Sequence, residues 1–185
     1  MSSSEPNANS NIVEVDGILF ETLMPVQTIR IPQTGEQVPV QFGVRITNRG
    51  SIPYRFDLPK FIPEIFDGDG RRIEYSVNSN ARQPTEEQDI PLINPGEYIT
   101  HWINVDLYWR GENCFGFGGF VRYGSVWSTY SFGTGTYQLQ LKYDSQLSRH
   151  RVVFRGVRRN EIDGFWVGTV STPLVKFNLV NLKGP

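Results

Sequence analysis

The stretch Val38-Pro39-Val40-Gln41-Phe42-Gly43-Val44-Arg45-Ile46-Thr47-Asn48 carries an apolar residue at every even position up to Ile46. A period of two is typical of a β-strand with one buried and one solvated face. The same alternation returns in Tyr137–Tyr143 and in Val175–Leu179. Because strands so far apart must pair across long stretches of chain, the pattern predicts a closed or two-layer β fold.

Composition places the chain among globular proteins of one domain. It has 185 residues, 38% hydrophobic and 13% aromatic, and a net charge of -1. A chain of this length can bury a sizeable core without a metal or a disulfide. The near-neutral charge gives no sign of a nucleic-acid or membrane surface. We therefore expect neither nucleic acid nor membrane among the partners.

The N-terminus and the single cysteine bear on localisation. Residues 1–11 are polar and lack the basic and apolar regions of a secretory signal, so we expect a flexible tail there. Residues 12–185 are expected to form a single β-sandwich domain. Cys114 has no second cysteine to pair with, which fits a reducing compartment. We expect a cytoplasmic protein.

Turn signals divide the rest of the chain into short strands. Asp16-Gly17 and the run 67–70 (Asp-Gly-Asp-Gly) stand between apolar segments and predict tight turns. A long strand is expected over Tyr98–Trp109, a glycine-rich loop over 110–119 and another strand over Phe120–Tyr130. No stretch shows sustained helical spacing, and the irregular turn intervals favour a sandwich over a uniform barrel.

The expected loop 110–119 carries the aromatic residues that we take as candidate partner contacts. Trp109, Phe115, Phe117 and Phe120 would form an apolar tip among glycines. Exposed apolar tips on loops often bind partners. Packing of the loop against its own protein is the alternative.

One basic cluster lies at 149–159. Arg155, Arg158 and Arg159 follow Arg149-His150-Arg151, with Val152-Val153-Phe154 between them. Such a segment could contact an acidic protein surface, or could serve as a solvated strand edge that blocks unwanted pairing. We include these three arginines among the candidate partner-binding residues.

Other motifs lack the partners that their chemistry requires. The run 67–70 has Tyr75 where a calcium loop of the EF type needs an acid, and Gly116-Phe117-Gly118-Gly119 has Val121 where a dinucleotide fingerprint needs glycine. His101 falls on the apolar face of its strand and is expected to be a hydrogen-bonded core histidine. We therefore expect no catalytic residue, no metal, no cofactor and no enzyme.

Several pieces of the chain resemble intracellular proteinase inhibitor (BsuPI-like) domains, which are immunoglobulin-type sandwiches. These pieces, spread over residues 37–143, are the strand 42–50 ending in Asn-x-Gly, the strand and turn 65–70, the Pro-Gly-Glu turn 95–97 and the strand entry 135–139. Two further segments are similar to loops of chagasin-like cysteine-peptidase inhibitors: Gly116-Phe117-Gly118-Gly119 to a Gly-x-Gly-Gly loop, and Pro32-Gln33-Thr34-Gly35 to a Pro-Thr-Thr-Gly loop. The insertion 108–134 and the basic segment depart from the pattern, and the Arg-Pro-Trp element of the second family is absent.

We accordingly predict an all-β fold: a single immunoglobulin-like antiparallel β-sandwich with a long inserted hairpin. The predicted core comprises Val40, Phe42, Val44, Ile46, Ile103, Val105, Leu139, Leu141, Trp166, Val175 and Phe177.

The predicted function is a non-enzymatic protein-binding module of the peptidase-inhibitor type that acts through surface loops. One alternative is a carbohydrate-binding module with an exposed face of Trp102, Trp109 and Trp127. Another is a structural subunit that forms a homo-oligomer through a sheet edge.

Overall fold

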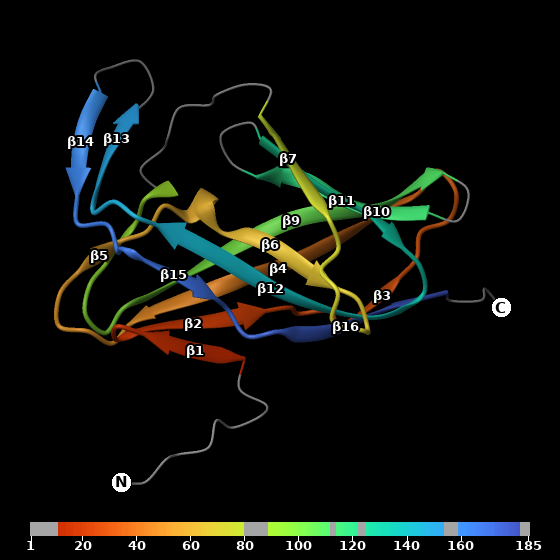
Figure 1. Cartoon of the computed structure of the whole chain (residues 1–185), viewed down its shortest axis with the longest axis horizontal. Coiled ribbons are helices and arrows are strands. Elements are labelled where there is room, and N and C mark those ends of the chain that lie inside the picture. The colour runs from red at the N-terminus through yellow and green to blue at the C-terminus, as the bar shows by residue number, and fades with distance from the viewer. Residues whose placement is uncertain (1–10, 80–88, 112–113, 122–124, 154–158, 182–185) are drawn as a thin grey trace, which may run out of the picture.

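The computed structural model describes residues 11–79, 89–111, 114–121, 125–153 and 159–181, without the side chains of 79, 120–121, 150–153 and 159–160 (Figure 1). Within those residues the chain forms the strands β1 (Ile12–Val15), β2 (Ile18–Leu23), β3 (Thr28–Arg30), β4 (Gln37–Asn48), β5 (Tyr54–Arg55), β6 (Ile62–Phe66), β7 (Tyr75–Ser79), β8 (Leu92–Ile93), β9 (Tyr98–Gly111), β10 (Cys114–Val121), β11 (Ser125–Phe132), β12 (Gly135–Ser145), β13 (Arg149–Val153), β14 (Arg159–Asp163), β15 (Gly168–Ser171) and β16 (Val175–Val180), and the 3-10 helix η1 (Leu58–Lys60).

The first sheet has seven strands in the order β1-β2-β4-β9-β10-β11-β7. At its centre β4 and β9 run antiparallel in an unbroken register from Gln37 opposite Tyr108 to Thr47 opposite Tyr98. The alternation of apolar and polar residues over 38–46 sets this pairing, since Val40, Phe42, Val44 and Ile46 all point inward and are buried.

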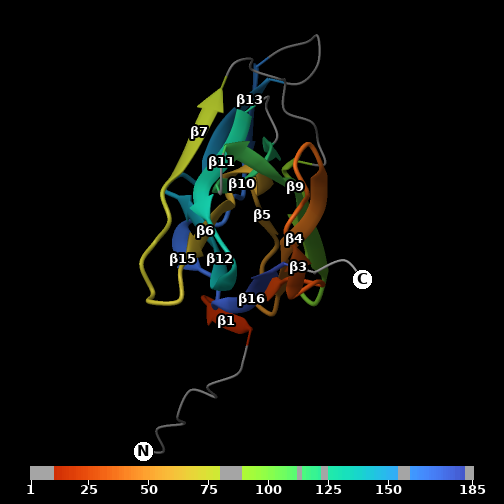
Figure 2. The same cartoon turned by 90° about the vertical axis from the view of Figure 1, so that its right-hand side faces the viewer.

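The second sheet is built on β12. One edge of β12 pairs with β6, the other pairs with β16 and then with β15, and β3 runs parallel to β16. In Figure 2, β6, β12 and β15 lie on one side of the molecule and β4 and β9 on the other. β2-β4-β9 and β6-β12-β16 correspond to the A-B-E and C-F-G strands of an immunoglobulin-like sandwich, so the predicted fold class is confirmed.

The predicted inserted hairpin is present as β10 and β11, which extend the first sheet. The prediction of a loop over 110–119 is wrong, because Cys114–Val121 is a strand. Its glycines allow close approach of neighbouring strands: a Cβ on Gly116 would lie 2.7 Å from the Thr129 carbonyl oxygen, and one on Gly119 would lie 2.5 Å from that of Asn104.

Both predicted tight turns are confirmed. Asp16 and Gly17 have φ of 50° and 75°, the two positive values that a type I′ hairpin turn requires between β1 and β2. At the second turn, Asp67 Oδ1 accepts hydrogen bonds from the backbone N–H groups of Asp69 and Arg71, and Gly70 has φ of 79°. These side-chain bonds stabilise the turn in the way that is common for aspartate.

The core lies between the two sheets. Ten of the predicted core residues are buried, and Val175 is partly buried against them. Trp166 lies at the centre of an aromatic layer, with ring centroids 5.4 Å from Phe20, 5.9 Å from Phe56 and 5.9 Å from Tyr143. This layer joins β2 of the first sheet to β12 of the second.

His101 faces the core from β9, with its ring 6.3 Å from that of Phe61. The predicted core position of His101 is therefore confirmed. Its side chain forms no hydrogen bond with another described residue, so the predicted hydrogen bond is not found. Burial lowers the pKa of His101 to about 4 from an ordinary value of 6.5.

The Trp166→Ala substitution is predicted to lower the free energy of unfolding by about 3–5 kcal/mol, because it leaves a cavity between the sheets. Denaturant unfolding monitored by circular dichroism measures this change. Val167→Ala is the matched control: Val167 is 44% exposed and should cost less than about 0.5 kcal/mol. Equal stability of the Trp166 variant and the wild type would contradict the assigned core.

The low pKa of His101 predicts a loss of stability as the pH falls from 6.5 towards 4, since only the unfolded state takes up the proton in that window. Between pH 7 and 5 the loss is on the order of 2 kcal/mol. Urea unfolding at both pH values should show this loss in the wild type and a smaller one in His101→Phe. Parallel pH profiles of the two proteins would contradict the assignment.

Candidate functional site

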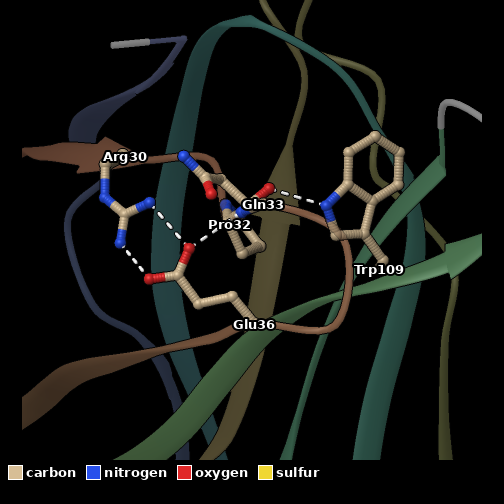
Figure 3. Close-up of polar contacts among 5 residues, drawn as sticks. All are labelled: Arg30, Pro32, Gln33, Glu36 and Trp109. Carbon is tan, nitrogen blue, oxygen red and sulfur yellow. Dashed lines mark hydrogen bonds and ion pairs between the residues drawn. The ribbon is translucent and has the colours of Figure 1, made fainter. Parts of the chain in front are cut away.

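The connection between β3 and β4 is held in one shape by the carboxylate of Glu36 (Figure 3). This carboxylate accepts hydrogen bonds from Arg30 Nη1 at 2.7 Å, from Arg30 Nη2 and from the backbone N–H of Gln33 at 2.8 Å. The Glu36 N–H donates back to the Gln33 carbonyl at 2.9 Å. A two-pronged bond to a guanidinium fixes direction as well as distance.

The same contacts shift the pKa values of both partners. Hydrogen bonding to Arg30, and then to the Gln33 N–H, lowers the pKa of Glu36 to about 2. The bond to Glu36 raises the pKa of Arg30. The loop therefore keeps its charge pair at any pH near neutrality.

Trp109 of β9 anchors the other side of this loop. Its Nε1 donates a hydrogen bond of 2.6 Å to the Pro32 carbonyl (Figure 3). Its ring centroid lies 4.3 Å from that of Phe115. Pro32 is buried, whereas Gln33, Thr34 and Gly35 are exposed. We call residues 32–36, with the anchoring contacts of Arg30 and Trp109, the braced loop.

An aromatic and basic surface adjoins the braced loop on the outer face of the first sheet. Gln37, the first residue of β4, lies opposite Tyr108 in the register, and Gly116 of β10 lies between Tyr108 and Tyr130. The Arg110 guanidinium carbon is 3.7 Å from the centroid of the Tyr130 ring, a close cation–π contact. We call Tyr108, Arg110 and Tyr130 the tyrosine–arginine face.

Hydroxyl groups continue this face towards β7. The Ser76 and Ser128 Oγ atoms share a hydrogen bond of 2.9 Å, and Ser128 Oγ and Tyr130 Oη share one of 2.6 Å. The bond to Ser128 is the main cause that lowers the pKa of Tyr130, with a smaller contribution from Arg110. Burial raises the pKa of Tyr108. Ser128 is buried beneath the surface, which therefore offers two phenols and one cation that can donate to carboxylate or carbonyl oxygens.

The predicted aromatic tip is wrong. Phe117 is 1% exposed, and Phe115 is 6% exposed and packs under Trp109, so both belong to the core. They point inward because they alternate with the outward-facing Gly116 and Gly118 along β10. Trp109 is half-buried and acts as an anchor, and the side chain of Phe120 lies outside the described residues.

The basic segment forms the β13–β14 hairpin. Arg149 pairs with Asp163 and, at 3.6 Å, with Glu161. Arg155, Arg158 and the side chain of Arg159 lie outside the described residues, so their predicted role in partner binding stays a prediction.

The predicted tryptophan face is not assembled. Trp127 is 1% exposed and Trp109 is turned towards Pro32, which leaves Trp102, at 38% exposure, as the exposed member of the three. Among the described residues, no group of three His, Cys, Asp or Glu side chains is placed to hold a metal ion.

Sequence reasoning missed the tyrosine–arginine face and the Glu36 brace. Parity could have found Tyr108 and Arg110, because even positions of β9 face away from the buried Ile103, Val105 and Leu107. The Arg30–Glu36 pair left no periodic signal, because it spans a loop.

Comparisons with known proteins give a distant likeness in fold. No family model matches the chain, and no curated protein matches it. A solved structure from Bacillus subtilis, described as a candidate lipoprotein, superposes with a TM-score of 0.32 and 13% identity over 84% of this chain. The match covers 39% of that protein's chain. Within the described residues, no helix has the length and apolar character to span a bilayer.

The Glu36 brace predicts that this carboxyl titrates near pH 2, well below its ordinary 4.5. The brace therefore stabilises the loop above pH 4.5 and is lost as the pH falls towards 2. Carbon-detected NMR of the side-chain carboxyl measures the midpoint. In Arg30→Gln the Glu36 midpoint should rise towards the ordinary value. A wild-type Glu36 midpoint at the ordinary value of 4.5 would show that the brace is absent in solution.

Proposed function

We propose that this chain is a non-enzymatic protein-binding module whose contact surface is the braced loop together with the tyrosine–arginine face. The observation that carries the proposal is the brace itself. Three exposed residues, Gln33, Thr34 and Gly35, project from a loop whose two ends are fixed by Glu36 and Trp109. A loop already held in one conformation loses little entropy on binding.

The chemistry of the adjoining face supports a protein ligand. Together with tryptophan, tyrosine and arginine are the residue types most enriched among the residues that dominate binding energy in protein interfaces. Tyr108 and Tyr130 supply rigid rings with polar tips, and Arg110 can pair with a carboxylate of the partner. The hydrogen bonds of Ser128 to Ser76 and to Tyr130 hold the Tyr130 phenol in position.

A peptidase is the partner class that we favour within this proposal. Pro32-Gln33-Thr34-Gly35 is similar to the Pro-Thr-Thr-Gly loop of chagasin-like inhibitors, and it is the tip of the braced loop. The resemblance to BsuPI-like inhibitor domains points to the same class. The second similarity to chagasin-like proteins loses its support, because Gly116–Gly119 lies inside β10. The cytoplasmic localisation and the assembly through a sheet edge stay predictions.

The test places a photo-activated cross-linking amino acid at position 34 of the full chain in cells that express it. A discrete covalent adduct with another protein is expected, because Thr34 lies at the exposed tip of the braced loop. Ser51 is the matched control position: it is also exposed and follows the opposite end of the long strand β4.

Mass spectrometry of the adduct distinguishes a peptidase inhibitor from a module that binds another class of protein. A peptidase in the adduct supports the inhibitor class, and purified peptidase should then be inhibited at least about tenfold more weakly by Thr34→Arg than by Ser51→Arg. Another protein supports the binding module and rejects the inhibitor. The absence of an adduct, or the same adduct from both positions, would reject the proposed surface.

A further inference from the structure

A groove of about 690 Å³ shares no lining residue with the braced loop or with the tyrosine–arginine face. It is lined by residues 22–25 and 27, where the chain leaves β2, and by residues 174–176 at the start of β16. Its lining residues come from both sheets and include Leu23, Gln27, Trp102, Gln138, Leu174 and Lys176.

Buried and partly buried hydrogen bonds fix the walls of this groove. Thr22 Oγ1 bonds to Thr172 Oγ1 at 2.7 Å and donates to the Pro173 carbonyl at 2.5 Å, which ties β2 to the segment before β16. Asn11 Nδ2 donates to Glu21 and to the Thr22 carbonyl. The groove is therefore formed before any ligand arrives, as is usual for small-molecule sites.

The exposed indole of Trp102 is the only aromatic ring among the described lining residues. It lies over Gly43 of the neighbouring strand, where a Cβ would come within 2.9 Å of Trp102 Cε3. With 38% of its surface exposed, the ring offers a flat apolar platform. Tryptophan is enriched in binding surfaces because it combines a large apolar ring with one N–H donor.

Uncharged amides stand around this platform. Gln27 and Gln138 line the groove, and neither side-chain amide forms a hydrogen bond with another described residue. Each carboxamide has an NH₂ group that donates and a carbonyl oxygen that accepts, so it can form hydrogen bonds to two neighbouring hydroxyl groups. Lys176 is the cation among the lining residues.

Two other ligand classes fit this lining less well. An extended peptide would need a free strand edge, but β2 is paired with β1 and β4, and β16 with β12 and β3. A nucleic acid would need several cations along its phosphates, and the groove has Lys176 alone among its described lining.

We propose that this groove is an oligosaccharide-binding site, a second function on a surface separate from the braced loop. The apolar C–H face of one sugar ring stacks on the Trp102 indole. Gln138 and Gln27 bond to ring hydroxyls, and Lys176 contacts a hydroxyl or an acidic substituent at the rim. The polar and apolar groups of the lining match a ligand that carries hydroxyls on its edges and apolar faces on its rings.

The test titrates the full chain with five soluble trisaccharides, namely maltotriose, cellotriose, xylotriose, mannotriose and chitotriose, by calorimetry and by NMR of the indole N–H groups. At least one trisaccharide should bind and move the indole cross-peak that is missing from the spectrum of Trp102→Ala. That variant should bind at least about tenfold more weakly, and Gln138→Ala about fivefold more weakly.

Tyr98→Ala is the matched control, because Tyr98 is an aromatic residue on the same outer face of β9, is 63% exposed and does not line the groove. It should bind as the wild type does. Melting curves show that each variant is folded. If no trisaccharide binds, or if the Trp102 and Tyr98 variants behave alike, the proposal is overturned. Cross-linking at position 34 is unaffected by these variants, so the failure of one proposal is distinct from the failure of the other.

Discussion

The packing of Trp166 between the two sheets is the contact on which the other features of the structure depend. Its ring packs against Phe20 of the first sheet, Tyr143 of the second sheet and Phe56, which follows β5. Its backbone N–H donates to the Arg55 carbonyl, so the ring is positioned by main chain as well as by its neighbours. A filled aromatic layer sets the spacing of the sheets, and close-packed interiors transmit that spacing along the whole length of the strands.

The rigidity of the braced loop comes from a combination of bonds rather than from its ion pair. The Arg30 and Glu36 side chains are partly exposed, and exposed ion pairs contribute little stability by themselves. Here the same carboxylate also accepts the Gln33 N–H, and Trp109 binds Pro32 from the neighbouring strand. Because Trp109 in turn packs on the buried Phe115, the loop is connected to the core, and this contact restricts its motion.

Periodicity predicted the fold well and the candidate site poorly, for a physical reason. Burial of one strand face leaves a period of two, so Val40 to Ile46 and Leu139 to Leu141 could be assigned to the core from sequence alone. The site depends on pairings between strands and across a loop, such as Arg110 over Tyr130 and Arg30 with Glu36, which leave no periodic trace. Composition also misled: four glycines and two phenylalanines indicated a loop where the chain forms a strand.

Those glycines are what gives the outer face its shape. None of Gly116, Gly118 and Gly119 has a positive φ, so their role is steric and not conformational. A Cβ on Gly118 would lie 3.0 Å from the phenol of Tyr108, and one on Gly116 would lie 3.1 Å from the ring of Tyr130. Side chains at these positions would lift both rings from the sheet and move Tyr130 out of reach of Arg110. The glycine-rich segment that resembles a loop in the sequence is therefore a strand against which the rings of Tyr108 and Tyr130 pack.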